Sequence, residues 1–455
     1  MTKPGRHFWW LRRWYLIRRS SNSFFGSQWA GGVVLVIFAV IALVLANLGA
    51  TKEWYHYILS SEFGFVFNDL AFEMSLEHWI DDGLMVLFFF VVGLEIKREL
   101  IAGELSNVKK ASLPIVAAIG GMVAPALIYL SINAGTEFEA GWGIPMATDI
   151  AFAIGILSLL GKRVPTALKV FLTALAIVDD LGTILVIAIF YTSSINFFML
   201  GGGILLLLLL YAMNKQGVTS VFLYVVPAIA IWYLFLNSGV HATIAGVLVA
   251  MMMPVRPRFS KKYFSYKVRY FLEDFKMHDR KSHEVLSNQY QFEDLERVKF
   301  IANSAISPAQ RLEHALNPFV TFVILPIFAL ANAGVEITDI ADVHVLGKAQ
   351  GQGIFLGLVL GKPLGIFLTC LAAIKLGLAV MPARGTWGLL FGVACLGGVG
   401  FTMSIFIANL AFGGTEYVDL AKIAILLASV SAVLLGTLVI NIVLQKQLRF
   451  HKGGN

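Results

Sequence analysis

The sequence predicts an all-α membrane protein that crosses the bilayer about twelve times. Of its 455 residues, 58% are hydrophobic and only 14% are charged, whereas about a quarter of the residues in a soluble domain are charged. A mean hydropathy of +0.78 over so long a chain requires many lipid-facing helices, because a water-soluble core could not hide so much apolar side chain. A conventional soluble enzyme is therefore excluded.

Twelve apolar stretches account for this hydropathy. They lie near residues 29–48, 78–96, 112–132, 144–160, 166–191, 197–213, 220–236, 240–254, 314–334, 351–375, 386–411 and 420–444. The first holds about 20 residues, more than the roughly 7 to 15 of a cleavable signal-peptide core. We therefore expect it to be a retained helix.

Lysine and arginine residues predict the orientation. If the N-terminus is cytoplasmic, the outer loops contain only three basic residues, Lys52, Lys348 and Lys422. A fourth basic residue, Lys362, lies inside a span. All other basic residues fall in cytoplasmic segments or at their borders, as the positive-inside rule requires. We expect a multi-pass plasma-membrane protein with both termini in the cytoplasm, and the net charge of +7 then needs no nucleic-acid partner.

This topology divides the chain into five segments. They are a basic cytoplasmic N-terminus (1–28), spans one to eight (29–254), a polar cytoplasmic insertion (255–312), spans nine to twelve (313–446) and a cytoplasmic tail (447–455). Because the insertion is polar and net basic, we expect a solvated loop beside acidic membrane lipid, with a docking domain as the alternative.

A β-hairpin is expected in the outer loop at residues 61–76. Two short runs of alternating apolar residues flank Asn68-Asp69, which favours a tight turn. Phe63, Phe65 and Phe67 would give the hairpin an apolar edge. Isolated hairpins are marginally stable, so we expect a second copy of the chain to cover this edge.

Few ionisable residues lie deep in the predicted spans. Each costs at least about 2.5 to 3.5 kcal/mol at the bilayer centre, so each needs a partner or a function. Asp149 follows Thr148 and Pro145 in span four. Since Pro145 removes a backbone donor, we expect a broken helix there whose freed groups bond to Thr148 and Asp149. A purely structural hydrogen bond between helices is the alternative for Asp149.

Asp179 and Asp180 are adjacent in the middle of span five. Two buried carboxylates so close cannot both be ionised without a compensating cation. One of them must therefore hold a proton, pair with an ammonium group or bind a metal ion. A site of this kind exchanges protons for cations, and it needs no resident cofactor.

Lys362 supplies the expected ammonium partner. It is deep in span ten, too far from either surface for its side chain to reach water easily. We expect it to pair with Asp179, either as part of transport or as a salt bridge that only balances charge.

Spans four and eleven are both interrupted, the second by the glycine cluster at 397–400. Each is the middle helix of a triplet, spans three to five and ten to twelve. An odd number of helices separates the triplets, so they have opposite orientations in the membrane. Interrupted helices at matching places of inverted repeats point to a transporter's ion site, although a glycine cluster also suits close helix packing.

Eight motifs resemble those of the NhaA family of bacterial sodium/proton antiporters. They are VGLEIKREL (92–100), PMATDIAF (145–152), VDDLG (178–182), GVHAT (239–243), RLEH (311–314), ANAG (331–334), LGKPLG (360–365) and GFTMS (400–404). The resemblance runs from about residue 25 to 445. NhaA is itself one of the proteins behind the inverted-repeat rule, so that rule and this resemblance are one line of support.

The resemblance implies an NhaA fold with two crossed discontinuous helices, spans four and eleven. It further implies electrogenic exchange of cytoplasmic Na+ or Li+ for a larger number of external protons in the bacterial inner membrane, and a homodimer. Asp180 then resembles the principal carboxylate for sodium and protons, and Asp179 its neighbour that pairs with Lys362. Thr148 and Asp149 match positions near the crossing.

Six further residues match positions that the family associates with pH response and the cytoplasmic funnel. They are Glu95, Arg98, Glu99, His241, Glu313 and His314. Four of them have a simpler interpretation. The first three, at helical spacings of three and four, would also form an ordinary surface ion network, and His241 suits a helix start at the membrane interface.

Two other functions compete with ion exchange. An intramembrane aspartyl protease would need two acids that converge from different spans and a Gly-x-Gly-Asp motif, which the sequence lacks. An organic solute/Na+ cotransporter on a related fold would keep the broken helices but would not require Lys362 to face Asp179. We therefore expect a transporter and not an enzyme.

Overall fold

The structure is a computed structural model. It describes residues 28–67, 70–192, 194–257, 259–278, 289–336 and 344–452. The chain divides into two compact units. Unit 1 comprises residues 1–88, 99–194 and 318–455, and unit 2 comprises residues 89–98 and 195–317. The predicted N-terminal segment and the Asn68-Asp69 turn lie outside the described residues, apart from Gln28.

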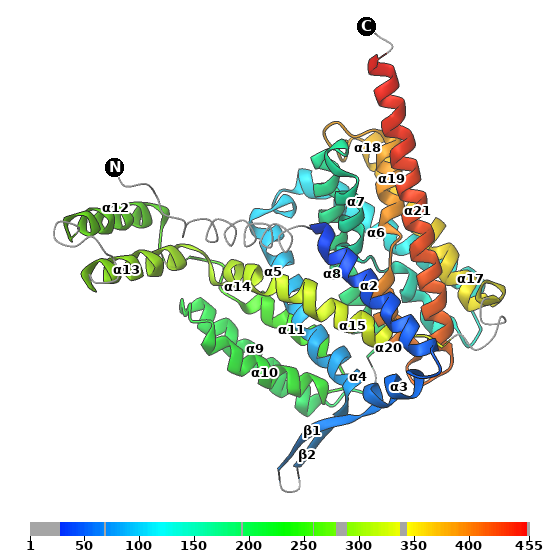
Figure 1. Cartoon of the computed structure of the whole chain (residues 1–455), viewed down its shortest axis with the longest axis horizontal. Helices are drawn as coiled ribbons and strands as arrows, with labels where there is room; N and C mark the ends of the chain where they lie inside the picture. The colour runs from blue at the N-terminus through cyan, green and yellow to red at the C-terminus, as the bar shows by residue number, and fades with distance from the viewer. Residues whose placement is uncertain are drawn as a thin grey trace, which may run out of the picture. The chain divides into compact units, whose positions relative to one another are not determined.

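Unit 1 is a bundle of long helices. Its elements are α2 (Gln28–Asn47), α3 (Lys52–Ser60), α4 (Leu76–His78), η1 (Trp79–Leu84), η2 (Glu104–Ser106), α6 (Val108–Asn133), η3 (Glu139–Met146), α7 (Ile150–Leu159), η4 (Gly161–Arg163), α8 (Thr166–Phe190), η7 (Val320–Ile324), α15 (Leu325–Asn332), η8 (His344–Gly347), α17 (Ala349–Leu356), η9 (Gly357–Gly361), α18 (Lys362–Lys375), α19 (Trp387–Gly397), α20 (Phe401–Phe412) and α21 (Tyr417–Lys452). α2 packs against α7 and α15, and α19 lies beside α21 (Figure 1).

The helices that lie wholly in unit 2 have between 11 and 19 residues. They are α9 (Phe197–Lys215), α10 (Phe222–Leu236), α11 (Ala242–Met252), α12 (Lys261–His278) and α13 (Gln289–Ala305). α9 and α10 lie side by side, as do α12 and α13 (Figure 1). Two helices have residues in both units, α5 (Met85–Ala102) and α14 (Pro308–Phe319).

Eight helices in the described residues are long and apolar enough to cross a membrane, or nine if the bent pair α19 and α20 is one span. The other three stretches for which the sequence predicts spans coincide with α5, α10 and α11. The sequence of α5 includes several charged residues, and α10 and α11 have only 15 and 11 residues. The chain is therefore a helical multi-pass membrane protein. Fewer helices among the described residues are long and apolar enough to span a membrane than the twelve that the sequence predicts.

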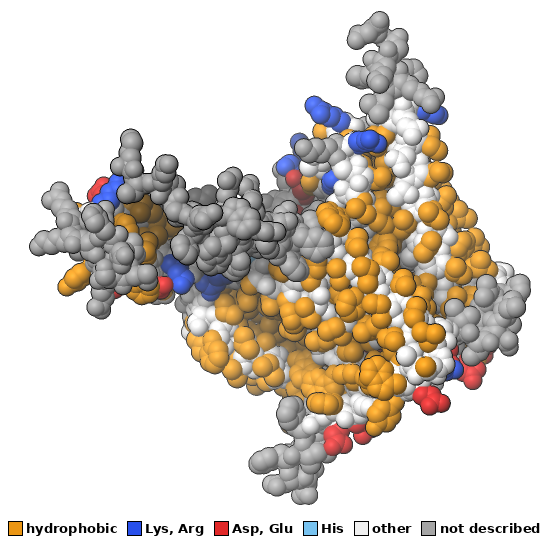
Figure 2. Space-filling view, viewed as in Figure 1, with side chains coloured by type: hydrophobic (Ala, Val, Ile, Leu, Met, Phe, Trp, Pro, Cys, Tyr) orange, Lys and Arg blue, Asp and Glu red, His pale blue; other side chains and the backbone are white. Residues whose placement is uncertain are grey.

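Most of the outward-facing side chains in the middle of α2 and α21, in unit 1, are apolar. Ile37, Val40 and Val44 on α2 are about half exposed, and Leu434 and Leu438 on α21 are more than half exposed. Figure 2 shows a broad hydrophobic surface over these two helices. Such a surface is unstable in water but is the normal lipid-facing side of a spanning helix.

Two of the candidate membrane spans are interrupted. η3 ends at Met146 and α7 begins at Ile150, with Pro145 in the last turn before the break. α19 ends at Gly397 and α20 begins at Phe401, and the two are bent by 43°. The breaks lie where the sequence predicts them, at a proline and at a glycine cluster.

Glycines bring α6 close to the helix that carries Lys362. A Cβ on Gly365 of α18 would collide with the Gly120 carbonyl of α6, and a Cβ on Gly361 would collide with Pro125. Both positions therefore require glycine at this spacing of four residues, as in closely packed membrane helices. This close approach holds α18, the helix that begins at Lys362, against α6.

Strands β1 (Glu62–Phe67) and β2 (Leu70–Ser75) pair antiparallel, with Glu62 opposite Ser75 and Phe63 opposite Met74. They occupy the segment for which the sequence predicts a hairpin. Phe63 is 72% exposed. The two strands form the whole sheet among the described residues, so no other described strand pairs with their outer edges.

Candidate ion site

The two interrupted segments of unit 1 meet at their breaks. The Asp149 amide N–H donates to the Val399 carbonyl oxygen at 2.7 Å, and the Thr148 hydroxyl lies 3.0 Å from the Gly397 carbonyl oxygen. These contacts satisfy backbone groups that each break leaves without a helical partner, which is how irregular backbone is tolerated inside a membrane protein.

Asp149 ties the two breaks together through its carboxylate. Its Oδ1 accepts the Phe152 N–H at 3.0 Å and thereby caps α7. Its Oδ2 accepts both the Thr402 hydroxyl at 2.6 Å and the Thr402 N–H at 3.2 Å. Asp149 is 2% exposed, and the N-termini of α7 and α20 supply it with positive dipole ends.

Lys362 and Asp179 form a fully buried ion pair. The Lys362 ammonium donates to Asp179 Oδ2 at 2.7 Å, and the two side chains are 0% and 1% exposed. Lys362 also donates to the carbonyl oxygen of Met146, at the end of η3. The same Asp179 oxygen accepts the Thr148 hydroxyl at 2.7 Å. The ammonium therefore joins α18, α8 and the first break.

Asp180 follows Asp179 on α8 and is 1% exposed. It directly follows the carboxylate that pairs with the Lys362 ammonium. Thr183, one helical turn further along α8, is 2% exposed. The site thus brings two adjacent carboxylates, one ammonium and the hydroxyl of Thr148 into one buried region.

This arrangement has a definite chemical consequence. One ammonium balances one carboxylate, so a second ionised carboxylate beside it leaves a net negative charge in a medium of low dielectric constant. A proton or a small cation at Asp180 removes that charge. Oxygen atoms of carboxylates, hydroxyls and backbone carbonyls are the ligands that hard cations prefer, and these are the groups present.

Part of the predicted pH-response set forms a second cluster, in unit 2. The Arg98 guanidinium lies 3.2 Å from the Glu313 carboxylate and 3.5 Å from that of Glu95. Glu313 is almost completely buried, whereas Arg98 is 38% exposed. The next residue along α5 toward its N-terminus, Lys97, donates to the carbonyl oxygens of Met251 and Met253. Met251 lies in the last turn of α11, and Met253 directly follows that helix.

The other three members of this set have different surroundings. In unit 1, the Glu99 carboxylate accepts the Glu104 N–H at 2.9 Å. In unit 2, His314 is exposed, and His241 lies directly before α11. Because Met251 is ten residues from His241 along that helix, the two ends are about 15 Å apart. His241 is therefore not part of the Arg98 cluster.

Sequence reasoning did not single out two residues of the site. Thr402 supplies the shortest bond to Asp149, and the Ser404 hydroxyl donates to the Ile144 carbonyl oxygen at 2.8 Å. Both belong to the GFTMS motif directly after the glycine cluster. A polar side chain just after a break in a span was the signal that could have identified them.

The sequence profile of a family described as "Na+/H+ antiporter 1" matches residues 22–440. Curated relatives cover almost the same range. A protein of Sulfurimonas denitrificans named "Na(+)/H(+) antiporter NhaA" is 46% identical over 428 residues, 94% of this chain and 96% of the relative. Proteins of the same name from Christiangramia forsetii and Wolinella succinogenes are 43% and 46% identical, each over 93% or more of both chains.

These names describe transporters and not enzymes. The match covers both interrupted helices, the Asp179–Lys362 pair and the Arg98 cluster. The chain therefore belongs to the Na+/H+ antiporter 1 family, the family of the NhaA proteins.

Proposed function

We propose that this protein is an electrogenic antiporter that extrudes cytoplasmic Na+ or Li+ in exchange for a larger number of external protons. The observation that carries the proposal is the buried cluster of Asp179, Asp180 and Lys362 beside two interrupted helices. The names of the relatives support sodium and protons as the transported ions.

In the proposed cycle, Asp180 holds either a sodium ion or a proton. A bound sodium ion takes oxygen ligands from Asp180 and its neighbours, and a proton neutralises the same carboxylate when sodium leaves. Because both ligands compensate one buried negative charge, each favours release of the other. Competition for the Asp180 carboxylate therefore couples sodium binding to proton release, and no second site is needed for this coupling.

Asp179, Lys362, Thr148 and Asp149 have supporting roles in this proposal. Lys362 pairs with Asp179 when sodium is absent, as the 2.7 Å contact suggests. When sodium binds, Asp179 turns toward the ion and Lys362 loses its proton. Two protons then leave for each sodium ion taken up, which makes the cycle electrogenic. Thr148 and Asp149 hold the two breaks together around the site.

We further propose the twelve-span topology with inverted repeats, spans three to five and ten to twelve, and crossed interrupted helices. The segments α6 to α8 and α17 to α21 supply these triplets, each with a break in its middle member. α5, α10 and α11 then complete the count as shorter or more polar spans.

The distribution of charge supports an orientation with both termini in the cytoplasm of a bacterium and the protein in its inner membrane. In unit 1, Lys and Arg side chains gather at the end that carries the turn between α18 and α19, and Asp and Glu gather at the end that carries α3 (Figure 2). The positive end faces the cytoplasm under the positive-inside rule. The insertion at 255–312 then lies near acidic lipid on the cytoplasmic side.

We propose that Glu95, Arg98, Glu99, His241, Glu313 and His314 adjust transport to cytoplasmic pH. Support comes from the partly exposed Arg98 bridge between Glu95 and the buried Glu313. Protonation of either carboxylate would weaken the bridge, so its occupancy depends on pH.

The function is tested in proteoliposomes that contain a pH-sensitive dye. Added sodium should move protons out of the vesicles, and potassium should not. With the membrane potential set by potassium and valinomycin, an inside-negative potential should speed sodium extrusion and enlarge the final sodium gradient, since each elementary charge gains about 2.3 kcal/mol per 100 mV. An initial rate and a gradient that ignore the potential would show that exchange is electroneutral.

A further inference from the structure

Helices α12 and α13 of unit 2 form a hairpin whose base is closed by two backbone hydrogen bonds. The Ala309 N–H donates to the Pro254 carbonyl oxygen at 3.1 Å, and the Phe259 N–H donates to the Ser304 carbonyl oxygen at 3.2 Å. Only residues 253–260 separate α11 from α12. Since a chain extends at most about 3.5 Å per residue, α12 begins within about 30 Å of the end of α11. If α11 is a span, the hairpin is held close to the membrane surface.

One face of α12 is covered by α13, which lies beside it (Figure 1). The Gln291 side-chain amide of α13 donates to the Phe275 carbonyl oxygen of α12 at 3.3 Å. The Arg297 guanidinium of α13 lies 5.8 Å from the centre of the Phe271 ring. Gln291 and Ile301 are 1% and 6% exposed. The inner face of α12 is therefore the one that carries Phe271 and Phe275.

A different face of α12 carries a row of exposed side chains that are aromatic or apolar. The row consists of Tyr263, Tyr266, Tyr270 and Met277, which are between 42% and 65% exposed. Their spacings of three, four and seven residues align them along the helix. At 100° per residue, the row lies about 140° around the helix from Phe271 and Phe275. We call it the tyrosine row.

Positive charges lie on both sides of the tyrosine row. On one side, about 80° around the helix, three exposed basic residues recur at every seventh position, Lys262, Arg269 and Lys276. On the other side, the Lys267 ammonium lies 6.0 Å from the ring centre of Tyr263 and 5.5 Å from that of Tyr270. An apolar row between cations is typical of a helix that lies in the interface of an acidic membrane.

The charges of the two helices indicate what the tyrosine row contacts. α12 contains five Lys or Arg residues against Glu273 and Asp274, a net charge of +3. α13 contains two basic and three acidic residues, a net charge of −1. A second copy of the α12 face would bring like charges together, whereas an acidic lipid surface complements them. Tyrosine is also enriched at the headgroup level of membranes.

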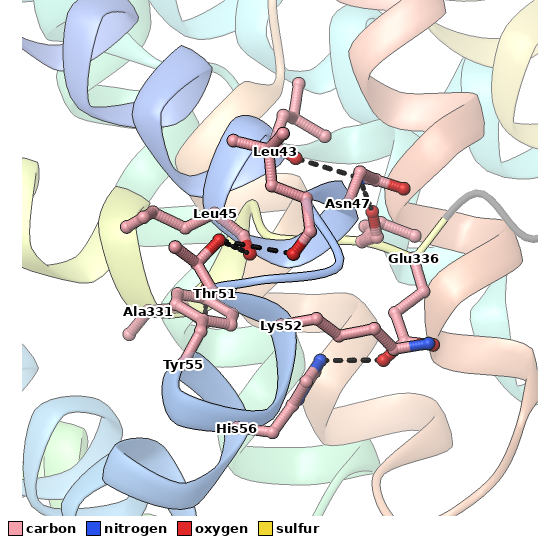
Figure 3. A network of polar contacts seen from close by, with 11 residues as sticks. Leu43, Leu45, Asn47, Thr51, Lys52, Tyr55, His56, Ala331 and Glu336 are labelled. Carbon is pink, nitrogen blue, oxygen red and sulfur yellow. Dashed lines mark hydrogen bonds and ion pairs between the residues drawn. The ribbon is translucent and has the colours of Figure 1, made fainter.

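α3 of unit 1 is a surface helix that protein contacts hold in place instead (Figure 3). The Tyr55 hydroxyl donates to a carbonyl oxygen in the last turn of α15 at 2.6 Å. Glu336 lies 2.6 Å from Lys52 and 2.8 Å from His56. Tyr57 on the same helix is 72% exposed, but one lysine and one glutamate give α3 no net charge from Lys, Arg, Asp and Glu. Tyr57 is therefore a suitable control for the tyrosine row.

We propose that α12 docks on an acidic phospholipid surface, with the tyrosine row among the headgroups and Lys262, Arg269 and Lys276 against the lipid phosphates. The proposed topology assigns this surface to the cytoplasmic leaflet. The docking itself does not depend on the exchange of ions. Each basic residue near an acidic membrane surface strengthens binding about fivefold, so the three together distinguish an acidic bilayer from a neutral one.

The first test measures contact between the tyrosine row and lipid. Tyr266→Cys and Tyr57→Cys are placed separately in a full-length protein with Cys370→Ala and Cys395→Ala, since both native cysteines are buried. Each is labelled with a fluorophore and reconstituted in nanodiscs that contain phosphatidylcholine brominated near its headgroup, with or without phosphatidylglycerol. Phosphatidylglycerol should increase quenching at Tyr266→Cys at least threefold and change quenching at Tyr57→Cys less than 1.5-fold. Both faces of a nanodisc are acidic, so the result does not depend on orientation.

Equal quenching of the Tyr266→Cys label in neutral and acidic nanodiscs would overturn the proposal. A label at this position that is shielded from water to the same degree in detergent and in both nanodiscs would show that protein covers the tyrosine row, and would also overturn it. Proton movement on addition of sodium is measured separately in the same proteins, so a failure of the exchange function is distinguishable from a failure of docking.

The second test changes the charge of α12 and keeps the label at Tyr266→Cys. Arg269→Gln should at least halve the increase in quenching that phosphatidylglycerol causes, and the triple variant with Lys262→Gln and Lys276→Gln should abolish it. Lys299→Gln removes the same charge from an exposed position on α13 and should change the increase by less than a fifth. An increase that persists in the triple variant, or equal losses in Arg269→Gln and Lys299→Gln, would contradict docking through the basic residues of α12.

Discussion

Asp149 and Asp179 illustrate two ways of keeping a carboxylate in a membrane-spanning bundle. Asp149 is compensated by hydrogen bonds, from Thr402 and from the Phe152 N–H at a helix start. Asp179 is compensated by the full charge of Lys362. A buried carboxylate can be compensated by hydrogen-bond donors or by a paired cation.

The first prediction concerns this pair. Lys362→Ala should lower stability by about 3 to 5 kcal/mol, because it leaves the Asp179 carboxylate buried without its ammonium partner. Asp179→Asn in the same chain should restore part of the loss, since the remaining side chain is neutral. Thermal unfolding of the two single variants and the double variant in detergent measures the coupling. Strictly additive losses would show that the two groups do not stabilise each other.

At the scale of elements, the two breaks could be predicted and their mutual contact could not. Pro145 and the glycines at 397–400 are local signals that interrupt a helix. The bond from Thr402 to Asp149 joins residues 253 positions apart, and no local pattern specifies such a partner. The short π-helical segments η7 and η9 were also unforeseen, because they result from packing and not from local sequence.

The second prediction concerns that long-range bond. Thr402→Val keeps the shape of the side chain and the backbone N–H but removes the hydroxyl that donates to Asp149 at 2.6 Å. Removal of one partner of a buried hydrogen bond costs about 1 to 3 kcal/mol, so the melting temperature should fall by the corresponding amount.

Thr437→Val is the matched control for Thr402→Val. The Thr437 hydroxyl donates to the Val433 carbonyl oxygen of its own helix, and its removal should change stability by less than about 0.5 kcal/mol. If both variants melt together with the wild type, the Thr402 hydroxyl does not hold the two breaks together.

At the scale of the whole molecule, composition was the most reliable guide. Low charge and high hydropathy predicted a helical multi-pass membrane protein, and the structure and the family match agree. The predicted number of spans, twelve, is higher than the number of helices that are long and apolar enough to span, in part because α10 and α11 are shorter than a typical span. A cavity of about 500 Å³ in unit 1, lined in part by Asp81, was not predicted, since residues from four separate parts of the chain form it.

The third prediction concerns the proposed homodimer. Phe63 is 72% exposed, and in the described part of the chain no third strand pairs with β1 or β2. A hairpin of this kind is stabilised when a second copy extends its sheet. Deletion of residues 63–73 should therefore yield monomers in detergent, as measured by light scattering, while sodium-dependent proton movement continues. A dimer that survives the deletion would place the interface on the helices.

The central claim is that sodium binding at Asp180 and Asp179 displaces protons from Asp180 and Lys362. The most direct measurement is the pH of a weakly buffered solution of purified protein during addition of NaCl. The wild type should release protons as sodium binds, KCl should cause no release, and Asp180→Asn should bind no sodium and release no protons. Sodium binding by the wild type without proton release would contradict the account.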